Sequence, residues 1–250
     1  MTEIKNAVIS YRMLVAISIA VLVLMSPFFL DRMWTYMAES DVLYLITMPM
    51  ALSGFSPFAC LFPIIPYGLR FAEEYNSNYI RFVISRYGRL RYILEKIFAS
   101  IVSGGCVTGT AFLLVFVFFT IAGKPVTKDT VISEFYLNSI WEPYLFIWEG
   151  KAILLLKVVL AFLHGAVWAL MALLVSAIYT NRYAAIVFPY AIYQVSWHLL
   201  SKSLFNPVYL LRGDVGGYPE LYFPYVIQGL TILLLAILSA IFLWRKCDDH

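Results

Sequence analysis

The sequence predicts an all-α fold: a polytopic membrane protein with six transmembrane helices, forming a single domain over residues 1–250. Composition is the first reason. Hydrophobic residues make up 62% of the chain and charged residues 13%, with a mean hydropathy of +0.82. Soluble domains contain about 45–50% apolar and about 25% charged residues. The second reason is that the apolar residues fall in six long stretches, each near the ~20 residues that cross a bilayer as a helix.

These six stretches are almost free of charge. None of them contains Asp, Glu or Arg, and Lys157 is the only lysine inside them. A backbone in lipid must satisfy its own hydrogen bonds, so uncharged stretches of this length are typical of spanning helices. The expected spans are residues 13–30, 42–69, 97–122, 152–179, 183–200 and 222–244.

An even number of spans places both termini on the same side of the membrane. Most of the 18 Lys and Arg residues lie on that side, and such residues accumulate in cytoplasmic loops. We therefore expect a multi-pass protein of the plasma membrane with both termini cytoplasmic. The basic residues lie at span ends, so the net charge of +3 favours contact with membrane lipid and does not indicate nucleic acid.

The long cytoplasmic connection, residues 70–96, has the pattern of a short amphipathic helix. Tyr75, Tyr79 and Phe82 are spaced to share one helical face, and Gly88 can end the helix in a left-handed conformation. One interpretation is an interfacial helix whose arginines meet anionic lipid headgroups. The other is a docking element for a cytoplasmic partner.

This segment resembles the loop that follows the second span in permeases of type-2 ABC exporters. Asn78 stands where that family often has Gly, and Asn tolerates a left-handed backbone better than most residues. The resemblance covers the loop closely and the six-span layout loosely. The matching residues are Phe71, Glu73, Glu74, Tyr75, Ser77, Ile80, Arg81, Ile84, Ser85, Arg86, Gly88, Arg89, Tyr92, Ile93 and Lys96.

In that family the loop contains a coupling helix that contacts a separate ATPase chain. The resemblance therefore implies a permease subunit of an ATP-driven exporter, with an ATP-binding ABC subunit and a second permease subunit, identical or different, as partners. It implies no enzymatic activity and no cofactor in this chain, because the partner ATPase binds the ATP and Mg²⁺. The expected contacts with the ATPase are Glu73, Glu74, Tyr75, Ser77 and Arg81.

The second expected span contains four prolines, and an interior proline removes a backbone hydrogen bond and strains the preceding turn. We expect this helix to be kinked or broken. Pro49, Gly54 and Pro57 are candidate residues of a translocation pathway or hinge. An aromatic, kinked pathway suits amphipathic peptides or lipids. The alternative is irregular packing, because Pro is commoner in spanning helices than in soluble ones.

The third and fourth spans carry further candidates. Gly105 and Gly109 form a GxxxG pattern, which allows close helix packing. Lys157 and His164 are seven residues apart and share a face of the fourth span, and an ionisable residue inside a span is a candidate functional site. The alternatives are that Lys157 extends to the outer interface and that His164 is a hydrogen-bonded packing residue.

Two outer segments are expected. Residues 127–150 carry aromatic residues among acids, which is typical of a helix at headgroup level. Residues 201–225 contain several Pro and Gly and are too apolar for a free loop, so they predict either an outer re-entrant segment before the last span or a surface loop.

Other functional classes find little support. The three cysteines have no metal-like spacing, and HExxH, GxSxG and a Walker loop are absent. An EExxxR protease motif needs Arg at the position of Asn78. The alternative function is an ion-coupled secondary transporter with a three-plus-three inverted repeat, although the two halves show no similarity and no span contains a carboxylate.

Overall fold

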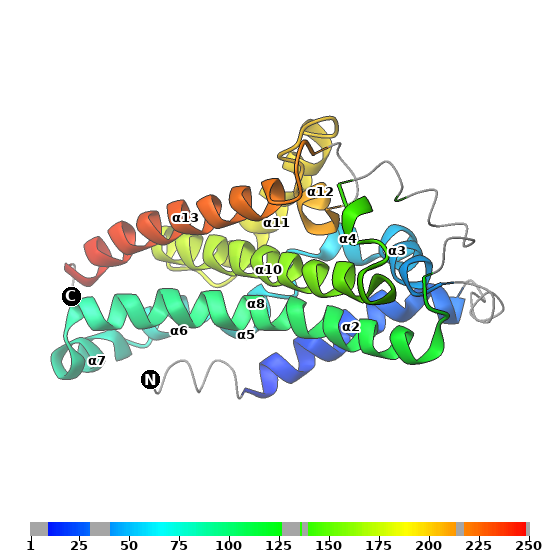
Figure 1. The fold of residues 1–250 in the computed structure, drawn as a ribbon. Helices are drawn as coiled ribbons and strands as arrows, with labels where there is room; N and C mark the ends of the chain where they lie inside the picture. Colours follow the sequence, from blue (N-terminus) through cyan, green and yellow to red (C-terminus); the bar gives the residue numbers. More distant parts are fainter. Residues whose placement is uncertain (1–9, 31–40, 127–135, 137–139, 214–217, 249–250) are drawn as a thin grey trace.

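The computed structural model describes residues 10–30, 41–126, 136, 140–213 and 218–248. Over these residues the chain consists of helices and their connections, with one isolated bridge between Asp41 and Lys124. The all-α prediction is therefore confirmed for the described part of the chain. Three long helices, α8 (Arg89–Ala122), α10 (Lys151–Tyr179) and α13 (Phe223–Asp248), run alongside one another in Figure 1.

Four helical stretches among the described residues are long and apolar enough to cross a membrane, which supports a membrane protein. They differ in how far they are enclosed by protein. The stretch that contains α10 is 72% buried and the one that contains α13 only 22%, so α10 is central and α13 peripheral. The four are Tyr11–Phe29, within α2 (Tyr11–Leu30), Arg89–Ala122, Ile147–Tyr179 and Phe223–Asp248.

The second expected span is not one continuous helix. Residues 42–69 form α3 (Val42–Leu52), α4 (Phe55–Phe58) and α5 (Ile64–Tyr67), with turns between them. Pro57 lies in α4 and Pro63 caps α5, where a missing backbone N–H interrupts the helical ladder. The expected break is confirmed, and the single span over 42–69 is corrected to three short helices.

Two other boundaries also differ from the expected spans. The fifth, residues 183–200, is α11 (Ala184–Leu199), whose 16 residues fall just below the usual length for a span. The third was expected from residue 97, but α8 begins at Arg89 and has 34 residues. At about 1.5 Å per residue, α8 is longer than the ~30 Å hydrocarbon core, so its charged first turns extend beyond the core.

A very close helix contact lies between α8 and α10. A Cβ atom on Gly165 would lie 2.3 Å from the carbonyl oxygen of Gly104, and one on Gly104 would lie 2.3 Å from the Cβ of Ala169. Gly105 and Gly109 lie against Phe162 of α10. The GxxxG pattern thus identified a helix face that packs on α10, but the backbones approach more closely at Gly104 and Gly165.

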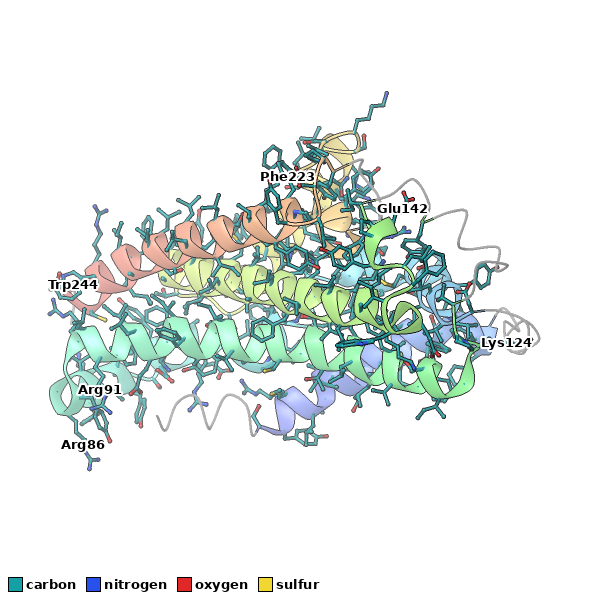
Figure 2. All side chains as sticks on the ribbon, in the orientation of Figure 1. Arg86, Arg91, Lys124, Glu142, Phe223 and Trp244 are labelled. Atoms are coloured by element: carbon teal, nitrogen blue, oxygen red, sulfur yellow. The ribbon has the colours of Figure 1, made fainter. Side chains whose placement is uncertain are left out.

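One end of the bundle gathers segments that are distant in sequence. There, α6 (Arg70–Asn76) and α7 (Tyr79–Tyr87) precede α8, and Arg89 pairs with Asp248 at the end of α13. Arg12 near the start of α2 pairs with Glu73 of α6 at 3.2 Å. Figure 2 shows Arg86, Arg91 and Trp244 at this end and Lys124 and Glu142 at the opposite end.

The opposite end is capped by short elements, namely η2 (Glu142–Tyr144), η3 (Ile147–Gly150) and α12 (Pro207–Arg212). The helix expected over residues 127–150 is replaced, in its described part after residue 140, by the two 3-10 turns η2 and η3. Asn206 caps α12 by accepting hydrogen bonds from the backbone N–H groups of Val208 and Tyr209. Residues 127–135, 137–139 and 214–217 lie outside the described part of the chain.

Candidate functional site

The segment of residues 70–96 forms two helices before α8 instead of one. α6 ends at Asn76, and Asn78 adopts a left-handed backbone with φ 57° and ψ 13° before α7 begins. Asn is among the residues that accept this conformation most readily. Tyr75 therefore lies on a different helix from Tyr79 and Phe82, and the single apolar face expected for these three residues is not formed.

α7 presents an aromatic and basic face to solvent. Phe82 is 73% exposed, and Tyr79, Arg81 and Arg86 are also exposed, whereas Ile80 is buried against the bundle. Gly88, with φ 80°, ends α7 as expected, although its ψ of 152° lies outside the left-handed helical region. A surface helix with large exposed aromatics and arginines is typical of an interaction site.

A buried ionic cluster fixes α6 to α8, and we call it the Glu74 cluster. Lys96 Nζ donates to Glu74 Oε1 at 2.6 Å and to the Tyr67 hydroxyl at 3.0 Å. The Tyr92 hydroxyl donates to Glu74 Oε2 at 2.9 Å, and Arg70 Nε donates to Oε1 at 3.1 Å. Both Glu74 carboxylate oxygens are therefore paired, and the lysine has no exposed surface.

The Glu74 cluster changes the role expected for Glu74. Its side chain is only 9% exposed and its oxygens are used inside the chain, so little of it remains available for contact with a partner. A buried charge pair with satisfied hydrogen bonds holds its neighbours in one geometry, because losing either partner leaves an unpaired charge. The cluster instead joins the 70–96 segment to the long helix α8.

The other residues expected at the ATPase contact have different environments. Glu73 is half-buried and pairs with Arg12. Tyr75 is half-buried, with Lys246 Nζ 5.6 Å from its ring centre. Ser77 is exposed and donates to the Glu74 carbonyl at 3.1 Å, and Arg81 is exposed on α7. The accessible surface is therefore formed mainly by α7, which follows the Glu73–Ser77 stretch.

Neighbouring side chains stabilise the interrupted segment of α3, α4 and α5. Gln194 of α11 donates to the Pro57 carbonyl at 2.7 Å, and the Tyr193 hydroxyl donates to the Ser56 carbonyl. Carbonyls freed by a broken helix need such partners at membrane depth. Gly54 is exposed, and a Cβ atom added to it would meet nothing within 4 Å. Pro49 lies within α3, and its side chain is outside the described part.

Lys157 does not reach solvent. Its side chain is fully buried, and Nζ lies 5.8 Å from the ring centres of both Tyr136 and Trp141. Trp141 Nε1 donates to the Gly213 carbonyl at 2.8 Å, and the Tyr136 hydroxyl lies 2.8 Å from Thr47 Oγ1. The alternative in which Lys157 extends to the interface is therefore wrong, because Tyr136 and Trp141 cover the ammonium group in cation–π contacts.

His164 lies on α10, 2% exposed, beside the rings of Trp168 and Tyr193. Its Nε2 atom has no hydrogen-bond partner among the described residues, so it differs from the hydrogen-bonded packing histidine considered above. It lines a cavity of about 240 Å³. Lys157, Gly54 and Pro57 are not among the residues that line this cavity, so these pathway candidates do not converge on one site.

Sequence reasoning missed the roles of Lys96, Tyr92 and Tyr67 in pairing Glu74. One signal was present, since Tyr92 and Lys96 are four residues apart at the start of a long apolar stretch and therefore share a helix face. Among the described residues, no group of three or more His, Cys, Asp or Glu side chains is arranged to hold a metal ion.

Comparisons with protein-family models, curated proteins and solved structures give no match for this chain.

Proposed function

We propose that this chain is the membrane-spanning permease subunit of an ATP-driven exporter of the type-2 ABC class, and that α7 docks on a separate ATPase subunit. The observation that carries this proposal is the exposed face of α7, where Phe82, Tyr79 and Arg81 project at one end of an apolar bundle. Exposed aromatic and arginine side chains are the residue types enriched at protein interfaces.

The geometry next to α7 suits the transmission of movement. α6 and α7 precede α8 directly, and the Glu74 cluster links α6 to Lys96 of α8. α8 is continuous from Arg89 to Ala122, so a displacement of α7 by the partner moves α8 as one body. In this mechanism the partner's ATP cycle shifts the bundle between two states that bind the cargo differently. This chain performs no covalent chemistry, and ATP and Mg²⁺ are bound by the partner.

The proposal includes six passes, with the broken α3–α5 segment as the second and the short α11 as the fifth. It also places both termini and α7 in the cytoplasm and α12 in an outer re-entrant segment. A second permease subunit, identical or different, completes the proposed exporter. The cargo class, amphipathic peptides or lipids, follows from an aromatic, kinked pathway.

The test uses the tagged full-length chain, purified in mild detergent from the cells that make it. We expect Mg²⁺-dependent ATP hydrolysis to elute with the chain, and an azido-ATP probe to label a second polypeptide. Phe82→Glu should abolish both signals, because it places a charge in the centre of the docking face. Trp148→Glu is the matched control, since Trp148 is a similarly exposed aromatic residue at the other end of the bundle.

Two results would contradict the proposal. One is an ATPase that stays bound to the Phe82→Glu variant when that variant is inserted and folded. The other is cargo transport by the purified chain alone, driven by an ion gradient, which would favour a secondary transporter instead. Substitution of Glu74 is unsuitable for this test, because the loss of a buried charge pair unfolds the segment whether or not it docks.

A further inference from the structure

A cavity of about 240 Å³ lies between α10, α11, α12 and α13. α10 contributes His164 and Trp168, α11 contributes Ser196, α12 contributes Leu210, and α13 contributes Gln228 and Thr231. Four helices therefore meet around one space. Most of the remaining lining is aliphatic or aromatic, and no charged side chain is among the lining residues that the structure describes.

Two polar side chains of this lining each carry an atom whose hydrogen bonding is not satisfied within the described part of the chain. His164 and Gln228 are each 2% exposed. His164 Nε2 and Gln228 Oε1 have no hydrogen-bond partner among the described residues. Buried polar atoms are normally paired, and an unpaired one calls for an explanation such as a ligand. Both orphaned atoms belong to residues that line the same cavity, which points to one ligand that serves both.

The chemistry of the two groups defines the ligand. Gln228 Nε2 donates to the Leu210 carbonyl at 2.9 Å, which orients the amide and leaves Oε1 as an acceptor that needs a donor. A neutral imidazole offers one donor and one acceptor nitrogen. A hydroxyl group donates and accepts at once, whereas a ketone or ester cannot donate to Gln228. A charged headgroup would lack a counter-ion here.

The opening of the cavity indicates the nature of the part of the ligand that lies outside it. Ile192 and Phe205 line the cavity and are also exposed on the outside of the bundle, so the cavity opens beside these two apolar side chains. Its volume is below the roughly 300–1,000 Å³ of pockets that enclose a whole small molecule. It therefore accommodates one end of a longer molecule whose chain remains in the bilayer.

We propose that this cavity binds the hydroxyl end of a neutral lipid, such as a long-chain alcohol or a monoacylglycerol. The hydroxyl donates to Gln228 Oε1 and accepts from the His164 imidazole, while the chain leaves between Ile192 and Phe205. The binding event needs no ATPase and involves a different part of the molecule from α7. Its failure would therefore leave the proposed permease function untouched.

Trp168 lines the cavity and provides the readout. The full-length chain in detergent micelles is titrated with a dodecanol brominated near its hydroxyl group, and separately with bromododecane. The Trp168 signal is the difference in fluorescence between the chain and its Trp168→Phe variant. We expect the alcohol to quench this signal at concentrations about tenfold lower than the hydrocarbon, in line with one well-made buried hydrogen bond.

Three variants make the test specific. Gln228→Leu and His164→Phe should each remove the preference for the alcohol, because each removes one hydrogen-bonding group while keeping an apolar lining. His198→Phe is the control and should keep the preference, since His198 is exposed on α11 and does not line the cavity. Equal quenching by the two probes, or a preference that survives in both cavity variants, would overturn the proposal.

Discussion

At the scale of single residues, two neighbouring glutamates have opposite roles. Glu73 pairs with Arg12 where both side chains meet solvent, at 35% and 51% exposure. Glu74 is enclosed by Lys96, Tyr92 and Tyr67. An exposed pair contributes little to stability, because water and salt screen it, whereas a buried pair leaves a costly unpaired charge when one partner is removed.

We therefore expect Lys96→Met to lower the free energy of unfolding by about 3–5 kcal/mol, since the Glu74 carboxylate would remain buried without its cation. Glu73→Gln should change it by less than about 1 kcal/mol. Denaturant titration in mixed micelles, followed by far-UV circular dichroism, measures both values. Combining Glu74→Leu with Lys96→Met should recover part of the loss, and equal losses from the two single changes would refute the assignment.

The sequence predicted some of these residue environments and not others. Asn78 was expected to tolerate a left-handed backbone, and it does, because that preference is local to the residue. The pairing of Glu74 with Lys96 spans 22 positions and depends on how the turn at Asn78 redirects α7. The burial of Lys157 against Trp141 likewise depends on where the segment around Trp141 packs, which no local sequence pattern predicts.

At the scale of elements, glycines determine how closely neighbouring helices approach each other. A Cβ on Gly165 would lie 2.1 Å from Thr108 Oγ1 and 2.3 Å from the Gly104 carbonyl oxygen. One on Gly109 would lie 3.3 Å from the Phe162 Cβ, and one on Gly54 would meet nothing within 4 Å. The three glycines thus form a graded series from closed to open.

Gly165→Ala should lower the stability of the chain by about 1–3 kcal/mol, because the added methyl group meets backbone that cannot move aside without separating α8 from α10. Gly109→Ala should cost less, and Gly54→Ala should stay within about 0.5 kcal/mol. Thermal unfolding of the three variants in detergent measures the order. A Gly165→Ala variant as stable as Gly54→Ala would show that α8 and α10 are not in contact there.

The interruption within residues 42–69 shows which features of a helix follow from the local sequence. Four prolines predicted the interruption, because each removes a backbone donor. The side chains that donate hydrogen bonds to the freed carbonyls, Tyr193 and Gln194, come from α11, 137 positions later in the chain. Proline spacing therefore indicated that the helix breaks, while the reason why the broken form is stable lies in tertiary packing.

At the scale of the whole molecule, the two ends of the bundle differ, because ion pairs join several segments at one of them. Arg12, Glu73, Arg89 and Asp248 join the start of α2, the 70–96 segment and the end of α13. Lys124 and Glu142 lie at the other end (Figure 2). If the first end faces the cytoplasm, where Lys and Arg accumulate, then Tyr11 and Ser85 share one compartment and Glu142 faces the other.

Single cysteines in a background without Cys60, Cys106 and Cys247 test this arrangement. Tyr11→Cys, Ser85→Cys and Glu142→Cys are suitable because all three positions are exposed. In intact cells a membrane-impermeant maleimide should label only the Glu142→Cys chain, and opening the membrane should make the other two reactive. Labelling of Tyr11→Cys and Ser85→Cys from opposite sides would contradict the two spans expected between these positions. Labelling of both from outside would place α7 beyond the reach of any cytoplasmic ATPase and would defeat the proposed function with it.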